Sequence, residues 1–274
     1  MNARAIAAWS AATLGCVLMT TNPVYRGIIL LSAVNFVVVV APRRFRPIGT
    51  GLMLAAVFAV ALNSLLAHVG VHVFAELPAW LPLVGGPLTI ESAVYGLDIA
   101  TGLVAAVLAA ASLSLAADPT ELIDALPSWL ERTGAALAAS LNFVPAIGRT
   151  FTAVSDAQRM RGWRPRRIVG WGEVLVPVML TAIEDSVQLA EAMEARGYGA
   201  TRRSHYPSAA WGWRDTGVVA GSALALAGMT FARASGLVGD WYPYPNLSLP
   251  PVEALAVLTC LPLVLPVLLW QSRP

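Results

Sequence analysis

Long apolar runs are the feature that most constrains this chain. They approach or reach the roughly 20 residues that cross the hydrocarbon core of a bilayer. Six such spans can be drawn, at residues 5–19, 25–41, 48–68, 93–117, 216–238 and 252–270. Hydrophobic residues make up 57% of the chain and charged residues only 12%, which fits a membrane protein and not an ordinary soluble domain. The sequence predicts an all-α polytopic membrane protein with about six transmembrane helices.

The arginines predict the orientation of these spans. Short loops that carry positive charge stay on the cytoplasmic side, and the connection at residues 42–47 holds Arg43, Arg44 and Arg46. With six spans, both termini then also lie in the cytoplasm. The outer connections carry little positive charge, with Arg26 and Arg233 near their ends. We expect a multi-pass protein of the plasma (inner) membrane. The net charge of +2 gives no reason to expect a nucleic-acid partner.

Residues 118–215 differ from the spans on either side and hold most of the arginines and acids. This divides the chain into transmembrane helices one to four (1–117), a cytoplasmic or interfacial region (118–215) and helices five and six (216–274). Asp118-Pro119 with Glu121 is typical of a helix start. Further helices are predicted over 131–161 and 172–196. The last is too apolar to be freely solvated and too charged to span a bilayer, so we expect a pair of amphipathic helices.

One short pattern occurs twice in this region. Asp156 to Trp163 reads acid, alanine, three variable residues, then Arg-Gly-aromatic, and Glu191 to Tyr198 repeats it. A glycine after the last helical residue and an arginine in the last turn are typical of an ordinary helix C-cap. Capping does not require the shared acid, alanine and aromatic residue, however. The repeat therefore also favours two equivalent docking points, at which a planar guanidinium would pair with carboxylates of a partner.

These residues carry a family resemblance. From Ala117 to Ser204 the chain resembles the transmembrane T component of energy-coupling factor transporters, a family that includes the cobalamin-cluster cobalt transport permease. The similarity rests on the helix start at Asp118, the apolar-Pro segment before Pro145 and two signatures. The first signature runs from Ala157 to Gly162 and the second, Ala-Met-Glu-Ala-Arg-Gly-Tyr, from Ala192 to Tyr198. Met160 departs from the alanine common in the first signature, and Asp98 stands where the family often has a basic residue.

The resemblance implies a function. In this family two cytoplasmic ATPase subunits each receive one coupling helix, and a separate membrane-embedded S component binds the cargo, a vitamin or a transition-metal ion. Carried over to this chain, the ATPase-docking residues are Arg161, Gly162, Arg196, Gly197, Ala157, Ala192 and Ala195. The small-residue tracts at 105–111 and 217–228 would allow close helix approach or sliding against that S component. ATP would be bound by the partner ATPases, and we expect no cofactor, metal or catalytic residue in this chain.

Other functions were weighed against this hypothesis. The chain has no Gly-x-x-x-x-Gly-Lys phosphate loop, no Gly-x-Ser-x-Gly elbow and no His-Glu-x-x-His helix, so an enzyme is not expected. His68 and His72 have the spacing of metal ligands on one helix face, with Glu76 as a third candidate. Together with Asp98 they would form the substrate site of a self-contained permease, the alternative hypothesis. Asp98 and other polar residues at membrane depth would otherwise pair between helices.

Overall fold

The computed structural model describes residues 1–78, 85–124, 130–164, 168–198 and 211–270. The chain forms two compact units, one of residues Met1–Leu122 with Ala209–Pro274 and one of residues Ile123–Ser208. We call them the membrane unit and the hairpin unit and describe each by itself. The assignment of residues 118–215 to a coupling role stays a prediction.

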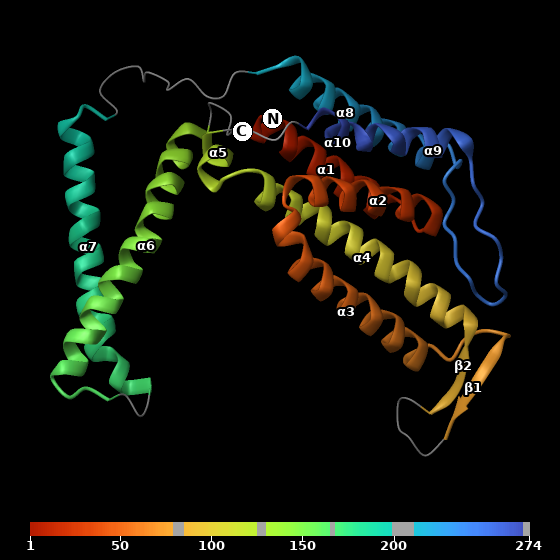
Figure 1. Cartoon of the computed structure of the whole chain (residues 1–274), viewed down its shortest axis with the longest axis horizontal. Coiled ribbons are helices and arrows are strands. Elements are labelled where there is room, and N and C mark those ends of the chain that lie inside the picture. The colour runs from red at the N-terminus through yellow and green to blue at the C-terminus, as the bar shows by residue number, and fades with distance from the viewer. Residues whose placement is uncertain (79–84, 125–129, 165–167, 199–210, 271–274) are drawn as a thin grey trace. The chain divides into compact units, whose positions relative to one another are not determined.

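The membrane unit is a bundle of long apolar helices (Figure 1). Among the residues that the structure describes, four helices are long and apolar enough to cross a membrane, and two apolar segments are shorter. The long helices are α2 (Pro23–Val40), α3 (Pro42–Leu66), α4 (Ile90–Ala116) and α8 (Trp213–Ala234). The shorter segments are α1 (Ala3–Met19) and the C-terminal run α9 (Ala254–Cys260), η3 (Leu261–Val264) and α10 (Leu265–Leu269). The prediction of an all-α polytopic membrane protein is confirmed.

The core of the membrane unit lies around α4, which packs against α1, α2 and α3. Trp9, Tyr25 and Phe36 are its largest fully buried side chains. The Trp9 and Phe36 rings are 4.4 Å apart, centroid to centroid. The Trp9 indole N–H donates to the Leu263 carbonyl oxygen at 2.8 Å. A buried indole N–H needs such a partner, so this bond ties the C-terminal segment to α1.

Hydrogen bonds show which ends of the helices lie together. At one end, the backbone N–H of Asn2 donates to Asp215 at 2.7 Å, which joins the starts of α1 and α8. At the other end, the Asn22 side chain donates to the Pro251 carbonyl at 2.7 Å. The turn from α2 to α3 therefore lies at the same end of the bundle as residue 2. This matches the expected alternation of loops, while the cytoplasmic assignment of that end stays a prediction.

Two parts of this unit differ from the sequence prediction. The expected span 252–270 is not one helix, because Pro262 and Pro266 interrupt it and a 3-10 turn separates α9 from α10. The connection after α3 also holds a small antiparallel hairpin, β1 (Val73–Leu77) and β2 (Gly86–Thr89), with a register shift in β1. No secondary structure was predicted for this connection.

The hairpin unit consists mainly of two long helices. α6 (Glu131–Met160) is followed by η2 (Ile168–Trp171) and α7 (Gly172–Ala195), and α6 and α7 run antiparallel (Figure 1). The bounds agree with the predicted helices 131–161 and 172–196. The short α5 (Pro119–Asp124) precedes them and begins where Asp118-Pro119 predicted. Pro145 and Pro177 lie inside helices.

Candidate docking residues at two helix ends

The first Arg-Gly end closes α6 with a Schellman motif. Gly162 has φ +88°, the left-handed region that favours glycine. Its N–H donates to the Arg159 carbonyl at 3.0 Å, and the N–H of Trp163 donates to the Gln158 carbonyl at 2.9 Å. These bonds satisfy carbonyls that the helix leaves unpaired. Arg161 is thereby fixed as the last residue before the chain turns away.

The second Arg-Gly end closes α7 in the same way. Gly197 has φ +78°. Its N–H donates to the Glu194 carbonyl at 2.8 Å, and the N–H of Tyr198 donates to the Met193 carbonyl at 3.0 Å. The two ends use the same offsets along the chain. The sequence repeat is therefore also a repeat of backbone geometry, with Arg196 in the position of Arg161.

The arginine side chains at both ends are open to contact. Arg161 and Arg196 are exposed. Within the part of the chain that the structure describes, neither guanidinium has a hydrogen-bond or ion-pair partner. Three alanines near them are also exposed, namely Ala157, Ala192 and Ala195. Ala157 and Ala192 each lie four residues before the arginine, hence on the same helix face. Their small side chains leave a partner room to approach that face.

The two ends lie at opposite ends of the helical hairpin. Since α6 and α7 run antiparallel, the end of α6 lies beside the start of α7, where the two helices pack, and the end of α7 points the same way as the start of α6, where the helices are farther apart (Figure 1). The 24 residues of α7 correspond to a helix length of roughly 36 Å. One hairpin can thus present the same guanidinium cap at two well-separated points. Whether ATPases bind there stays a prediction.

The aromatic residues that follow the glycines have different surroundings. Trp163 is only 9% exposed and packs with Val174 and Val178 of α7. Its indole N–H donates to the Gly170 carbonyl at 2.8 Å, and its ring lies edge-on to Trp171 at 5.4 Å. Tyr198 is 45% exposed. The repeat predicted the same role for both positions, whereas only Trp163 is buried.

A groove lies beside the second end. Its volume is about 530 Å³, and it is formed by α6 and α7 together with Tyr198. Apolar side chains dominate the lining, with Asn142 and Asp185 among them. This groove was not predicted from the sequence, although alanines and Phe143 at helical spacing on α6 were a signal for it.

The alternative site is not assembled. Asp98 pairs with Arg26, and the Asp98 Oδ2 to Arg26 Nη1 distance is 2.6 Å. His72 Nδ1 lies 2.6 Å from Glu91 Oε1, and His68 Nδ1 lies 3.4 Å from the Pro87 carbonyl oxygen. Each of the three has its own partner. Among the residues that the structure describes, no group of three or more His, Cys, Asp or Glu side chains is placed to hold a metal ion.

Glu91 belongs to the segment Leu88-Thr89-Ile90-Glu91, which weakly resembles the family, and the sequence alone predicted no contact for it. Its buried carboxylate contacts His72 and accepts from the backbone N–H groups of Val71 and His72 at 3.2 to 3.3 Å. Glu76, which was expected beside the histidines, lies instead in β1. An acid in the second position of an apolar span was the available signal. Glu91 anchors the segment that leads into the β-hairpin.

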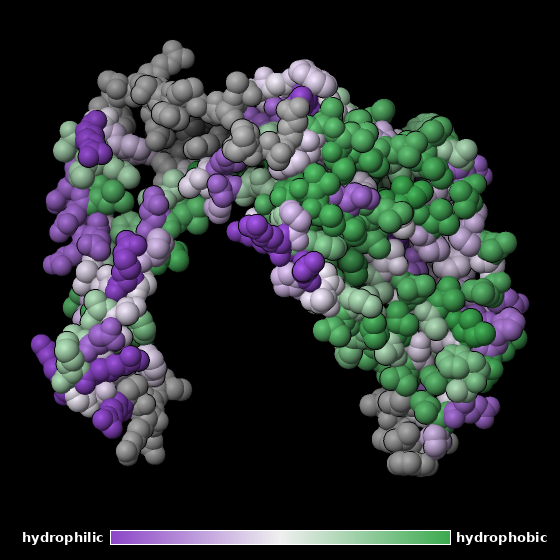
Figure 2. Space-filling model, in the orientation of Figure 1, coloured by the Kyte–Doolittle hydropathy of each residue, from purple (hydrophilic) through white to green (hydrophobic). Residues whose placement is uncertain are grey.

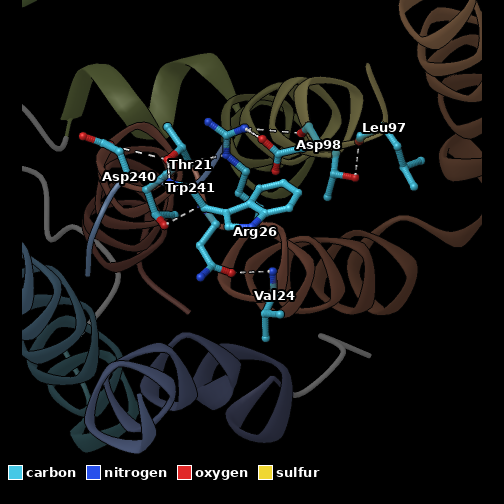
Figure 3. Close-up of polar contacts among 10 residues, drawn as sticks. Thr21, Val24, Arg26, Leu97, Asp98, Asp240 and Trp241 are labelled. Carbon is cyan, nitrogen blue, oxygen red and sulfur yellow. Dashed lines mark hydrogen bonds and ion pairs between the residues drawn. The ribbon is translucent and has the colours of Figure 1, made fainter. Parts of the chain in front are cut away.

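The Arg26–Asp98 pair belongs to a network that joins three helices and the last long loop (Figure 3). The Arg26 Nε–H donates to the Thr20 carbonyl at 2.8 Å, at the end of α1. Thr21 accepts from the backbone N–H of Trp241 at 3.0 Å. Arg26 was expected as a charge near an outer loop, whereas it is neutralised inside the bundle by Asp98 of α4. This contact supports the reading of Asp98 as a residue that pairs between helices.

The small-residue tracts contact other parts of this chain. A side-chain carbon added to Gly221 would lie 2.5 Å from Leu265, and one added to Gly228 would lie 2.6 Å from Thr259. Ala109 is buried, and its carbonyl oxygen accepts from the Ser10 hydroxyl of α1. These three residues therefore allow close packing within the bundle. The close approach of the tracts 105–111 and 217–228 to an S component stays a prediction.

The sequence of this chain is similar to those of known proteins. The chain is 27% identical over 194 residues to the energy-coupling factor transporter transmembrane protein EcfT of Bacillus subtilis, an alignment that covers 65% of this chain and 71% of that protein. It is 33% identical over 135 residues to EcfT of Streptococcus thermophilus, covering 42% of this chain and 50% of that protein.

The match to EcfT of Staphylococcus aureus, 27% over 164 residues, covers 53% of this chain and 61% of that protein. The chain thus spans between half and about 70% of the length of these relatives. The family model described as CbiQ, cobalt transport protein, matches residues 1–206, which include both Arg-Gly ends. The chain therefore belongs to the CbiQ family of cobalt transport proteins.

Proposed function

We propose that this chain is the energy-coupling transmembrane (T) subunit of an ECF-type ABC importer. It passes the motion of two cytoplasmic ATPase subunits to a membrane-embedded S component that takes up a vitamin or a transition-metal ion. The observation that carries the proposal is the same helix cap at both ends of one hairpin, with an exposed, unpaired guanidinium at each. Two matched contacts suit a pair of related partners. The family match and the EcfT names support the same role.

Arg161 and Arg196 are the proposed contacts with the ATPases. A guanidinium is a planar donor of several hydrogen bonds and pairs best with carboxylates. Gly162 and Gly197 end the helices immediately after each arginine, so that the guanidinium stands at the tip. Ala157, Ala192 and Ala195 let the partner surface approach. ATP is bound by the partners, and this chain supplies no catalytic group.

Coupling requires that the ATPases hold the two ends differently in their two nucleotide states. A ligand shifts an equilibrium only by its differential affinity for the two states. We propose that closure of the ATPase pair moves the two ends, and that the hairpin transmits this movement to the S component. Because α6 and α7 share the packed cluster around Trp163, force applied at one helix is passed to the other.

Charge reversal tests the proposal. Arg161→Glu and Arg196→Glu each place an acid opposite the carboxylates expected in the partner, so we expect loss of ATPase co-purification and of cargo uptake. Arg149→Glu is the matched control, because Arg149 is an exposed arginine of α6 away from both ends. All three variants should insert into the membrane equally. Uptake that survives the double reversal would contradict the docking role.

The orientation can be tested in whole cells. We propose that both termini and the α2–α3 turn face the cytoplasm. A cysteine at position 44 should then react with thiol reagents only when they reach the cytoplasm. The native Cys16 and Cys260 are buried, which limits background labelling. Labelling of intact cells by a reagent that does not cross membranes would reverse the topology.

A further inference from the structure

Three arginines surround the start of α3. Arg43, Arg44 and Arg46 are all exposed, and we call them the arginine collar. Each helical residue is rotated by about 100° from the one before. The three arginines therefore lie on one side of the helix, and Phe45 lies on the opposite side. Phe45 packs against the buried cluster of Ala33, Val37 and Leu108. The ring thus fixes the helix start and turns the guanidinium groups outward.

The collar has no counter-charge of its own. The sequence contains no acid from residue 27 to residue 75. In the described part of the chain, none of the three guanidinium groups has an ion-pair or hydrogen-bond partner. Asp98 is engaged by Arg26 and Asp215 by backbone N–H groups. Three cations also stand at the positive end of the α3 dipole. The three guanidinium groups are therefore available to an anion from outside the chain.

The helix that follows the collar is uncovered on one side. α3 has no fully buried residue and packs chiefly against α4. Met53 and Phe58 are 70% and 66% exposed, and Leu54 and Val57 lie beside them on the same face. Figure 2 shows a hydrophilic patch at the start of α3, bordered by the hydrophobic surface along that helix. Positive groups and an apolar strip therefore adjoin on one helix.

We propose that the arginine collar and the exposed face of α3 together bind an anionic phospholipid. The guanidinium groups take the phosphate, for which their donor geometry is suited, and the acyl chains lie along Met53, Leu54, Val57 and Phe58. A free phosphate would satisfy the collar alone and leave the apolar strip without a role. Since α4 holds α3 from one side only, the bound lipid supports its other side.

The test is a lipid titration of the full-length protein in detergent, followed by native mass spectrometry. Dioleoylphosphatidylglycerol is compared with dioleoylphosphatidylcholine and with inorganic phosphate. An arginine near an anionic surface contributes about fivefold in affinity. We therefore expect R43Q/R44Q/R46Q to weaken phosphatidylglycerol binding by roughly a hundredfold. The lysine triple R43K/R44K/R46K, which keeps the charge, should retain most of it.

Two control variants separate the collar from general effects. R149Q/R164Q/R214Q removes the same net charge elsewhere and should change phosphatidylglycerol binding less than twofold by this reasoning. M53S/F58S keeps the charge but reduces the apolar strip, and should weaken lipid binding while leaving phosphate binding unchanged. The helical content of each variant, measured by circular dichroism, must equal that of the unaltered protein.

Several results would overturn the proposal. Equal losses in the collar variant and in its charge-matched control would mean that only total charge matters. Equal binding of phosphatidylcholine, or binding of inorganic phosphate as tight as that of phosphatidylglycerol, would exclude an anionic lipid as the ligand. Unchanged phosphatidylglycerol binding by R43Q/R44Q/R46Q, with loss of co-purifying ATPase instead, would assign the collar to a protein partner.

Discussion

The two Arg-Gly ends have the same backbone and different surroundings. Both close with a left-handed glycine and the same pair of hydrogen bonds. At the end of α6 the next residue, Trp163, is buried against α7, whereas at the end of α7 the next residue, Tyr198, is exposed beside a groove. The first end is thus part of a small core. At the second end, Tyr198 is part of the lining of that groove.

The charges around the two ends differ as well. Beside Arg161, Arg159 pairs with Asp156 at 3.5 Å, and Arg164 follows in the chain. Beside Arg196 the corresponding positions are acidic, Glu191 and Glu194. The repeat thus determines the backbone geometry that exposes each arginine. The neighbouring residues determine how well each helix end is packed and which charges surround its guanidinium.

The largest expected effect is a difference in stability between variants of the two aromatic residues. Trp163→Ala removes a buried ring and its hydrogen bond, and should lower the free energy of unfolding of the hairpin unit by about 3 kcal/mol. Tyr198→Ala should cost less than about 1 kcal/mol, because its side chain is already half exposed. Hydrogen exchange of the α7 amides in the purified protein measures both. Equal exchange in the two variants would show that the ends are supported alike.

Substitutions of the two glycines should cost the same stability at both ends, because the two backbone caps are alike. A side-chain carbon added to Gly162 or Gly197 would meet no atom within 4 Å, so Gly→Ala costs only the left-handed backbone, about 1 kcal/mol at each end. Gly→Asn should cost less, since asparagine tolerates this conformation. Thermal unfolding followed by circular dichroism compares the four variants. A cost at Gly162 well above that at Gly197 would mean that the caps are not equivalent.

Local patterns were enough to predict the helices of this chain. Apolar runs gave the spans, and Asp118-Pro119 and the two glycines gave helix boundaries within a few residues of those observed. Each of these signals depends on neighbours within one or two turns. The cap geometry at Arg161 and Arg196 was predictable for the same reason, because a glycine after an arginine in the last turn decides it locally.

Contacts between distant residues could not be predicted in this way. Nothing near Asp98 indicates that Arg26 lies against it, since the two are brought together only by the packing of α2 on α4. The same holds for Glu91 and His72. Trp163 and Tyr198 occupy equivalent positions in the repeat, and only the fold of residues 168–178 around Trp163 distinguishes them.

The smallest expected effect concerns the charges that flank the two arginines. Arg159→Gln and Glu194→Gln alter equivalent positions with opposite signs. An exposed ion pair such as Arg159–Asp156 contributes little to stability, so neither variant should change unfolding measurably. If the partner grooves are acidic, however, Arg159→Gln should weaken ATPase binding about twofold and Glu194→Gln should strengthen it by a similar factor, both at low salt. Binding of the purified ATPase subunits to the full-length protein, measured at low and at high ionic strength, gives the answer. At high salt, where charges are screened, both variants should bind the ATPases as tightly as the unaltered protein does. Affinity changes in the same direction for both variants would show that the flanking charges do not face the partners.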